Sequence, residues 1–133
     1  MIGLDTNILA RFLLADDVGQ HDAARRLIDD AACSYWVPVT VVLELSWVLK
    51  GRGVPGPAAA RAIADLALLP NMRMQSAEAI AVAARAAEDG FEFADALHLA
   101  MSRKVDQFLT FDRQLARRCR AGSHAFPATR VPD

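Results

Sequence analysis

The spacing of apolar residues alternates along the chain between a helix-like and a strand-like pattern. After residue 5, apolar positions such as Ile8, Leu9 and Phe12 recur at helical spacing, which predicts a helix over residues 6–14. Helical spacing or a high alanine content predicts further helices over residues 17–32, 40–50, 58–69, 77–89, 93–104 and 112–120. Short apolar runs between them predict strands over residues 1–4, 35–37, 72–75, 107–111 and 125–131.

Capping and breaking residues set several of these boundaries. Thr40 is the predicted N-cap of the helix over residues 40–50, which Gly51 ends. Pro57 suits the first turn of the following helix, and Pro70 ends that helix.

The alternation of strands and helices predicts an α/β protein. Its expected architecture is a three-layer α/β/α sandwich with a central, mostly parallel sheet and helices on both faces. A length of 133 residues, of which 53% are hydrophobic, predicts a single domain over residues 1–133 and excludes a disordered chain. The longest apolar run is six residues, Ala79 to Ala84, which excludes a membrane-spanning helix.

Cysteine content and charge add two expectations. Only Cys33 and Cys119 are present, and no signal peptide precedes Ile2, so we expect a reduced, cytoplasmic protein. The net charge of -1 conceals an asymmetry: residues 1–102 carry -5, and residues 103–133 carry +4. The basic part indicates a polyanion held at one edge, although on charge alone a solvated basic helix face is the simpler explanation.

Four acidic residues stand out by position: Asp5, Glu44, Asp95 and Asp112. Asp5 and Asp112 follow predicted strands, and ligands of parallel sheets bind beyond the carboxyl ends of the strands. Asp5, Asp95 and Asp112 also stand where helices are predicted to begin, so N-capping explains each of these three taken singly.

Glu44 lies within the apolar stretch VVLELSWVL, with no Lys or Arg three or four residues away. A buried carboxylate needs a partner, so a surface position and a metal ion are the two open explanations. Oxygen-only ligands, with no paired Cys and no HxxxH spacing, argue against zinc and suit Mg²⁺ or Mn²⁺. Together the four acids predict a one- or two-metal site for phosphodiester chemistry, where the metal lowers the pKa of a bound water.

The stretches around these acids resemble PIN-domain ribonucleases, and bacterial toxins of the VapC type most of all. They are IGLDTN (residues 2–7), TVVLELSWVL (40–49), FADALHLA (93–100) and LTFDR (109–113). The resemblance spans residues 1 to about 118 and depends on all four stretches occurring in the same order. It implies one α/β/α domain around a parallel sheet, with the acids meeting in a cleft that binds Mg²⁺ or Mn²⁺.

The resemblance also implies residue roles and partners. The residues that it marks as catalytic and metal-binding are Asp5, Glu44, Asp95 and Asp112. They support the attack of water on an RNA phosphodiester, which leaves a 5′-phosphate and a 3′-hydroxyl. Asn7 and Thr110 match polar residues that support the acids. Toxins of this type commonly form homodimers and are blocked by a cognate antitoxin protein, so RNA, an antitoxin and a second copy are the expected partners.

Two further positions are candidates near the acids. His98 stands where an aliphatic residue is commoner in the family. It shares a helix face with Asp95, where it can orient a carboxylate or bind phosphate, although packing between helices is the simpler explanation. Four arginines follow Asp112 and can hold RNA phosphates or solvate the surface: Arg113, Arg117, Arg118 and Arg120. Arg113 is the one predicted to steady the scissile phosphate.

The leading prediction is a metal-dependent endoribonuclease, the toxin of a toxin–antitoxin pair, that hydrolyses RNA with a metal-activated water. A haloacid-dehalogenase-like phosphatase needs a second Asp two positions after the first, where this chain has Asn7. A non-catalytic nucleic-acid-binding or scaffold domain of the PIN type is expected to lack at least one of the four acids. All four are present.

Overall fold

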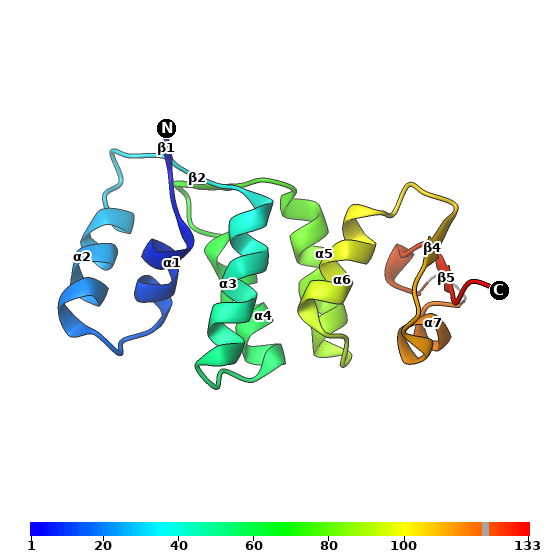
Figure 1. Cartoon of the computed structure of the whole chain (residues 1–133). Helices are drawn as coiled ribbons and strands as arrows, with labels where there is room; N and C mark the ends of the chain where they lie inside the picture. The colour runs from blue at the N-terminus through cyan, green and yellow to red at the C-terminus, as the bar shows by residue number, and fades with distance from the viewer. Residues whose placement is uncertain (121–122) are drawn as a thin grey trace.

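The computed structural model describes residues 1–120 and 123–133 (Figure 1). Its helices are α1 (Thr6–Leu13), α2 (Val18–Ile28), α3 (Val39–Gly51), α4 (Gly56–Leu66), α5 (Ala77–Glu88), α6 (Phe93–Met101), α7 (Arg113–Arg118) and the short 3-10 helix η1 (Ser123–Ala125). Its strands are β1 (Ile2–Gly3), β2 (Tyr35–Val37), β3 (Met72–Met74), β4 (Gln107–Leu109) and β5 (Ala128–Arg130). Every predicted element is therefore present in the predicted order. In the described part of the chain, no helix combines the length and apolar character needed to cross a membrane.

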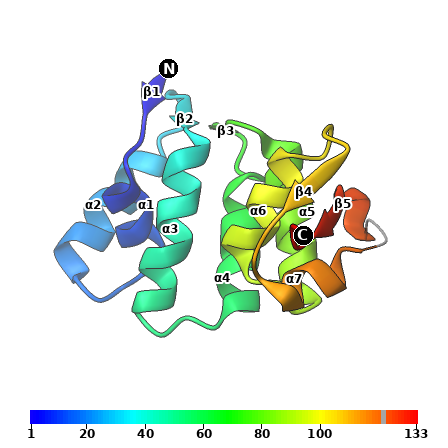
Figure 2. The same ribbon diagram turned by 45° about the vertical axis from the view of Figure 1, so that its right-hand side comes forward.

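The strands pair in parallel, which confirms the predicted α/β class, but they form two sheets. The first sheet has the order β1-β2-β3, with Ile2 opposite Tyr35 and Tyr35 opposite Met72. The second contains β4 and β5, with Gln107 opposite Ala128. Figures 1 and 2 show β4 and β5 beside α7, away from β1. The predicted α/β fold with a parallel central sheet is confirmed, and within the described residues β4 pairs with β5 and not with β1, β2 or β3.

The helical core is built around α5, which contacts α4 on one side and α6 on the other (Figure 2). The buried residues of α5 are mostly alanines: Ala79, Ile80, Ala83, Ala84, Ala86 and Ala87. Short side chains let helix axes approach closely, since the interaxial distance is set by the residues at the contact. The alanines of α5 thus form the close-packed contacts of this helix with α4 and α6.

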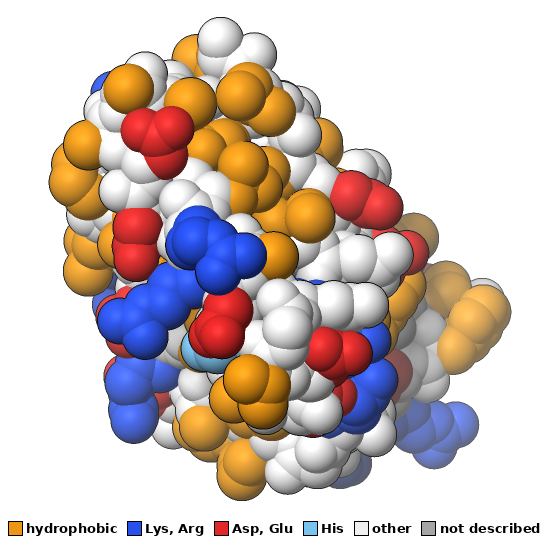
Figure 3. Space-filling model, turned by 90° about the vertical axis from the view of Figure 1, so that its left-hand side faces the viewer, with side chains coloured by type: hydrophobic (Ala, Val, Ile, Leu, Met, Phe, Trp, Pro, Cys, Tyr) orange, Lys and Arg blue, Asp and Glu red, His pale blue; other side chains and the backbone are white. Residues whose placement is uncertain are grey.

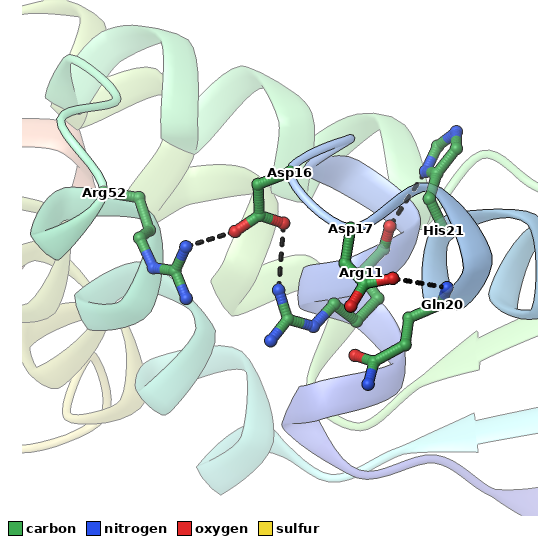
Figure 4. A network of polar contacts seen from close by, with 6 residues as sticks. All are labelled: Arg11, Asp16, Asp17, Gln20, His21 and Arg52. Carbon is green, nitrogen blue, oxygen red and sulfur yellow. Dashed lines mark hydrogen bonds and ion pairs between the residues drawn. The ribbon is translucent and has the colours of Figure 1, made fainter.

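Asp16 ties the loop between α1 and α2 to the end of α3 (Figure 4). Its carboxylate accepts a hydrogen bond from Arg11 at 2.9 Å and pairs with Arg52, which follows α3. Desolvation alone raises the pKa of Asp16, but the hydrogen bond and charge of Arg11 and the charge of Arg52 outweigh it. The pKa of Asp16 therefore lies below its usual range. The neighbouring Asp17 caps α2 by accepting from the Gln20 amide at 3.0 Å.

The end of the molecule formed by α1 and α2 carries mixed charges. Figure 3 shows acidic and basic side chains interspersed across this face, with apolar side chains gathered above them. An interspersed pattern of this kind creates no strong field of one sign.

Several predicted boundaries differ from the observed ones: α2 ends at Ile28 and not at residue 32, and α4 ends at Leu66, before the predicted stop at Pro70. Thr40 is not the N-cap of α3, because the helix begins at Val39 with Pro38 at the cap position. The Val39 amide instead donates to Oε1 of Gln75 at 2.9 Å, so the start of α3 is capped from the end of β3. Strand β4 ends at Leu109, and Phe111 beyond it is 83% exposed.

Close packing at α5 predicts the effect of enlarging one alanine. Ala83 is 0% exposed, so Ala83→Leu should lower the free energy of unfolding by about 1–3 kcal/mol, because the extra volume has to displace α4 or α6. Ala77→Leu, at the exposed start of the same helix, should change it by less than about 0.5 kcal/mol. Urea unfolding of both variants measures the difference, and equal stability of the two would show that α5 is not tightly packed.

Candidate active site

The structure divides the four predicted acids into two pairs. Asp5 and Glu44 meet around Thr6, where α1 lies against α3. Asp95 and Asp112 line one cavity formed by the start of α6 and the start of α7.

The first pair is held by a single threonine. Asp5 caps α1, and its Oδ1 accepts a hydrogen bond from the Thr6 amide at 2.8 Å. The Thr6 hydroxyl donates to Oε1 of Glu44. Glu44 is exposed on α3 while Thr6 is buried, so the surface explanation for Glu44 holds and Thr6 supplies its polar partner.

The second pair faces a cavity of about 250 Å³ whose lining includes Glu92, Asp95, Asp112 and Arg118. Asp112 caps α7 by accepting from the Leu115 amide at 3.0 Å, as the capping explanation predicts. Asp95 is not the cap of α6, because Glu92 occupies that position and accepts from the Asp95 amide at 3.0 Å. The Asp95 carboxylate therefore does not cap the helix, and Asp95 lines the cavity.

The surroundings of Asp95 disfavour its charged form. Burial raises the pKa of the Asp95 carboxyl most, and the negative charges of Glu92 and Asp112 raise it further. The positive charges of His98 and Lys50 lower the same pKa, but they are outweighed. A cation placed between Asp95 and Asp112 would remove this repulsion.

The expectation that all four acids meet in one cleft is not met. In residues 1–120 and 123–133, no three His, Cys, Asp or Glu side chains come together as a metal-binding group. Asp5 follows β1 and Asp112 follows β4, and these two strands belong to different sheets. The Asp95–Asp112 pair still fits Mg²⁺, which commonly takes one or two carboxylates and keeps several waters.

Comparison with protein families matches the PIN domain over residues 2–121. The chain belongs to the PIN domain family. PIN domains are generally metal-dependent ribonucleases, a chemistry for which oxygen-only acidic ligands are suited. Comparisons with curated proteins and with solved structures found no match.

The supporting residues of this PIN domain differ in their contacts. The Thr110 hydroxyl accepts from the Asp112 amide at 3.0 Å and so fixes the turn that carries this acid. Asn7 and His98 are exposed, on α1 and α6 respectively, and the charge of His98 acts on Asp95. Arg113 lines a separate cavity on the other side of α7.

Arg118, and not Arg113, lies beside the acids. Its Nη2 donates to the Asp89 carbonyl oxygen at 2.7 Å, and its guanidinium lies over the Phe91 ring at 4.1 Å from the centroid. These contacts hold a positive charge at the edge of the cavity that contains Asp95 and Asp112.

Sequence reasoning missed Glu92 and Lys50 as neighbours of Asp95, and Thr6 as the partner of Glu44. Glu92 had a readable signal, because it stands three residues before Asp95, the spacing between an N-cap and the N3 amide. No sequence signal indicated Thr6 or Lys50, because their partners are distant in sequence. The Thr6 hydroxyl binds Glu44, and the charge of Lys50 lowers the pKa of Asp95.

The raised pKa of Asp95 predicts a pH-dependent cost to stability. The folded chain holds this proton more tightly than the unfolded chain. The contribution of Asp95 protonation to the free energy of unfolding is therefore complete below the ordinary Asp pKa of about 3.9. It is lost as the pH rises through the pKa that Asp95 has in the folded chain. In EDTA at pH 7, Asp95→Asn should raise the melting temperature above that of the wild type, and the difference should vanish below about pH 4.

Thermal unfolding followed between pH 3 and pH 8 makes this comparison. Asp65→Asn is the matched control, because Asp65 is exposed on α4 and does not line the acidic cavity. A wild type more stable than Asp95→Asn at pH 7 would mean that the charges of Lys50 and His98 outweigh both the burial of Asp95 and the charges of Glu92 and Asp112.

Proposed function

We propose that this PIN domain is an Mg²⁺- or Mn²⁺-dependent endoribonuclease and the toxin of a toxin–antitoxin pair. The observation that carries the proposal is the carboxylate pair of Asp95 and Asp112 in one cavity, with a further acid, Glu92, beside it. Burial and like charges raise the pKa of Asp95, a state that a divalent cation relieves.

Asp95 and Asp112 would hold the cation, and water would complete its coordination. When bound, a divalent ion supplies a water of lowered pKa and neutralises charge on the phosphodiester under attack. Asp5 and Glu44 retain the role of metal ligands that membership of the family implies, as a second carboxylate pair beside α3.

The remaining residues of the cavity orient the pair and the substrate. Glu92 fixes the first turn of α6 by binding the Asp95 amide, and Thr110 fixes the turn before α7 by binding the Asp112 amide. Arg118 contributes a guanidinium that can donate to phosphate oxygens at the edge of the cavity. The positive charge of Arg118 therefore favours a phosphate at this cavity and offsets part of the repulsion from the acids.

The toxin role requires a partner that covers the site, and we propose a cognate antitoxin and a second copy of the chain. Two open strand edges support this part of the proposal. Ile2 of β1 is 47% exposed and Leu109 of β4 is 52% exposed, and neither strand has a second neighbour within the described residues. Exposed apolar residues on open edges are typical of surfaces that associate with another chain.

Cleavage of RNA tests the enzymatic part of the proposal. The purified wild type should cut total cellular RNA in Mg²⁺ or Mn²⁺ and not in EDTA, while Asp95→Asn and Asp112→Asn should lose about 100-fold or more of the rate, because each removes a metal ligand. Asp65→Asn should cleave at the wild-type rate. Product lengths and amounts are measured on denaturing gels.

Cleavage that persists in EDTA, or in both site variants, would contradict the proposed role of the pair. The toxin role is tested separately by inducing the chain in a bacterial host. The wild type should arrest growth and Asp95→Asn should not, whereas continued growth with active enzyme in the cell would leave a nuclease without a toxin function.

A further inference from the structure

A second cavity, of about 380 Å³, lies between α7 and β5. Four of its seven lining residues are arginines, and none is acidic. The lining consists of Arg113, Ala116, Arg117, Arg120, Thr129, Arg130 and Val131. This cavity is distinct from the one that contains Asp95 and Asp112.

The arginines come from both elements and converge on one space. Arg113 and Arg117 are one turn apart on α7, Arg120 follows the helix, and Arg130 enters from β5. Arg130 is held in position, because its Nε donates to Oε1 of Gln107 on β4 at 2.9 Å. Among residues 1–120 and 123–133, none of the four forms an ion pair with an acid: every arginine with a carboxylate partner belongs to another part of the fold.

Four positive charges that share one cavity without a carboxylate repel one another, and a bound anion relieves this repulsion. Guanidinium groups present planar pairs of donors that match phosphate oxygens in bidentate geometry. The volume admits a phosphate group together with water. The chemistry of the cavity therefore selects an anion of high charge density.

The two cavities lie on opposite sides of one short helix. Asp112 at its cap, Leu115 and Arg118 face the acidic cavity, whereas Arg113 and Arg117 face the basic one. A helix with its side chains is about 10–12 Å across, so the two cavities are roughly that far apart. A polyanion that repeats its phosphates along a chain can reach both.

We propose that the arginine cavity binds backbone phosphates of the RNA strand next to the phosphodiester held at Asp95 and Asp112. This inference deepens the proposed function and rests on it for the identity of the polyanion. An acidic peptide is the less suitable occupant, because the apolar lining is limited to Ala116 and Val131 and offers no pocket for the buried anchors that dominate protein–protein affinity. Phosphate contacts of this kind position a strand without reading its sequence.

The salt dependence of RNA binding tests the proposal. A 5′-fluorescein-labelled single-stranded RNA of 20 nucleotides is titrated by fluorescence anisotropy in EDTA, which prevents cleavage, at several salt concentrations. Each phosphate contact contributes about -0.7 to the slope of log K against log salt for single strands. The double variant R117Q/R120Q should therefore reduce the magnitude of the slope by about 1.4 and weaken binding equally for RNAs of different sequence.

The matched control is R26Q/R85Q, which removes two exposed arginines from α2 and α5 and should leave the slope unchanged. Thermal unfolding of both double variants verifies that they fold. A wild-type slope in R117Q/R120Q overturns the inference. So does a polyglutamate peptide that binds more tightly than the RNA through the same arginines, because the cavity then belongs to an acidic protein partner.

Cleavage measured in parallel separates this inference from the proposed function. If the wild type cleaves RNA and the slope of R117Q/R120Q is unchanged, the endoribonuclease stands and the arginine cavity does not hold its substrate. If the slope falls as expected but the wild type cleaves no RNA in Mg²⁺ or Mn²⁺, the cavity binds RNA and the endoribonuclease proposal fails.

Discussion

The packing of α5 between α4 and α6 is the contact on which the rest of this structure depends. Buried alanines along α5 permit both neighbours to approach, and α6 begins directly after the turn that follows α5. That turn contains Gly90, whose φ of +98° is a left-handed conformation that favours glycine. The start of α6, with Glu92 at its cap and Asp95 in its first turn, is thereby fixed next to the start of α7 and Asp112. Alanine packing in the core thus determines where the acidic cavity forms.

Helix α7 separates two cavities of opposite charge, and both cavities are used in the proposed function. The cavity on one side concentrates carboxylates and raises the pKa of Asp95, so it attracts a cation. The cavity on the other side concentrates guanidinium groups, so it attracts phosphate. In the proposed function an RNA strand contacts both cavities, because arginines bind its phosphates and the carboxylate pair would hold the divalent ion beside the bond that is hydrolysed. The C-terminal excess of positive charge in the sequence is therefore a localised feature, gathered mainly around α7 and β5.

The sequence predicted the order of helices and strands because those elements depend on local spacing, caps and breakers. Capping by Asp5 and Asp112 was predictable for the same reason, and the surface position of Glu44 was one of the two explanations that the sequence left open. Strand pairing was not predictable, because the residues within and next to a strand do not determine its partner. Their pattern does not indicate that β4 pairs with β5 and not with β1. Which arginine faces the acids also depends on the rotation of α7, which places Arg118, and not Arg113, in their cavity.

Isothermal titration calorimetry with Mn²⁺ shows whether Asp95 and Asp112 hold a metal ion, and it does so without requiring a substrate. The wild type should bind Mn²⁺, and Asp95→Asn and Asp112→Asn should each weaken binding by about 10-fold or more, while Asp65→Asn should bind as the wild type does. Wild-type affinity in both Asp95→Asn and Asp112→Asn would contradict the claim that this pair holds a metal ion.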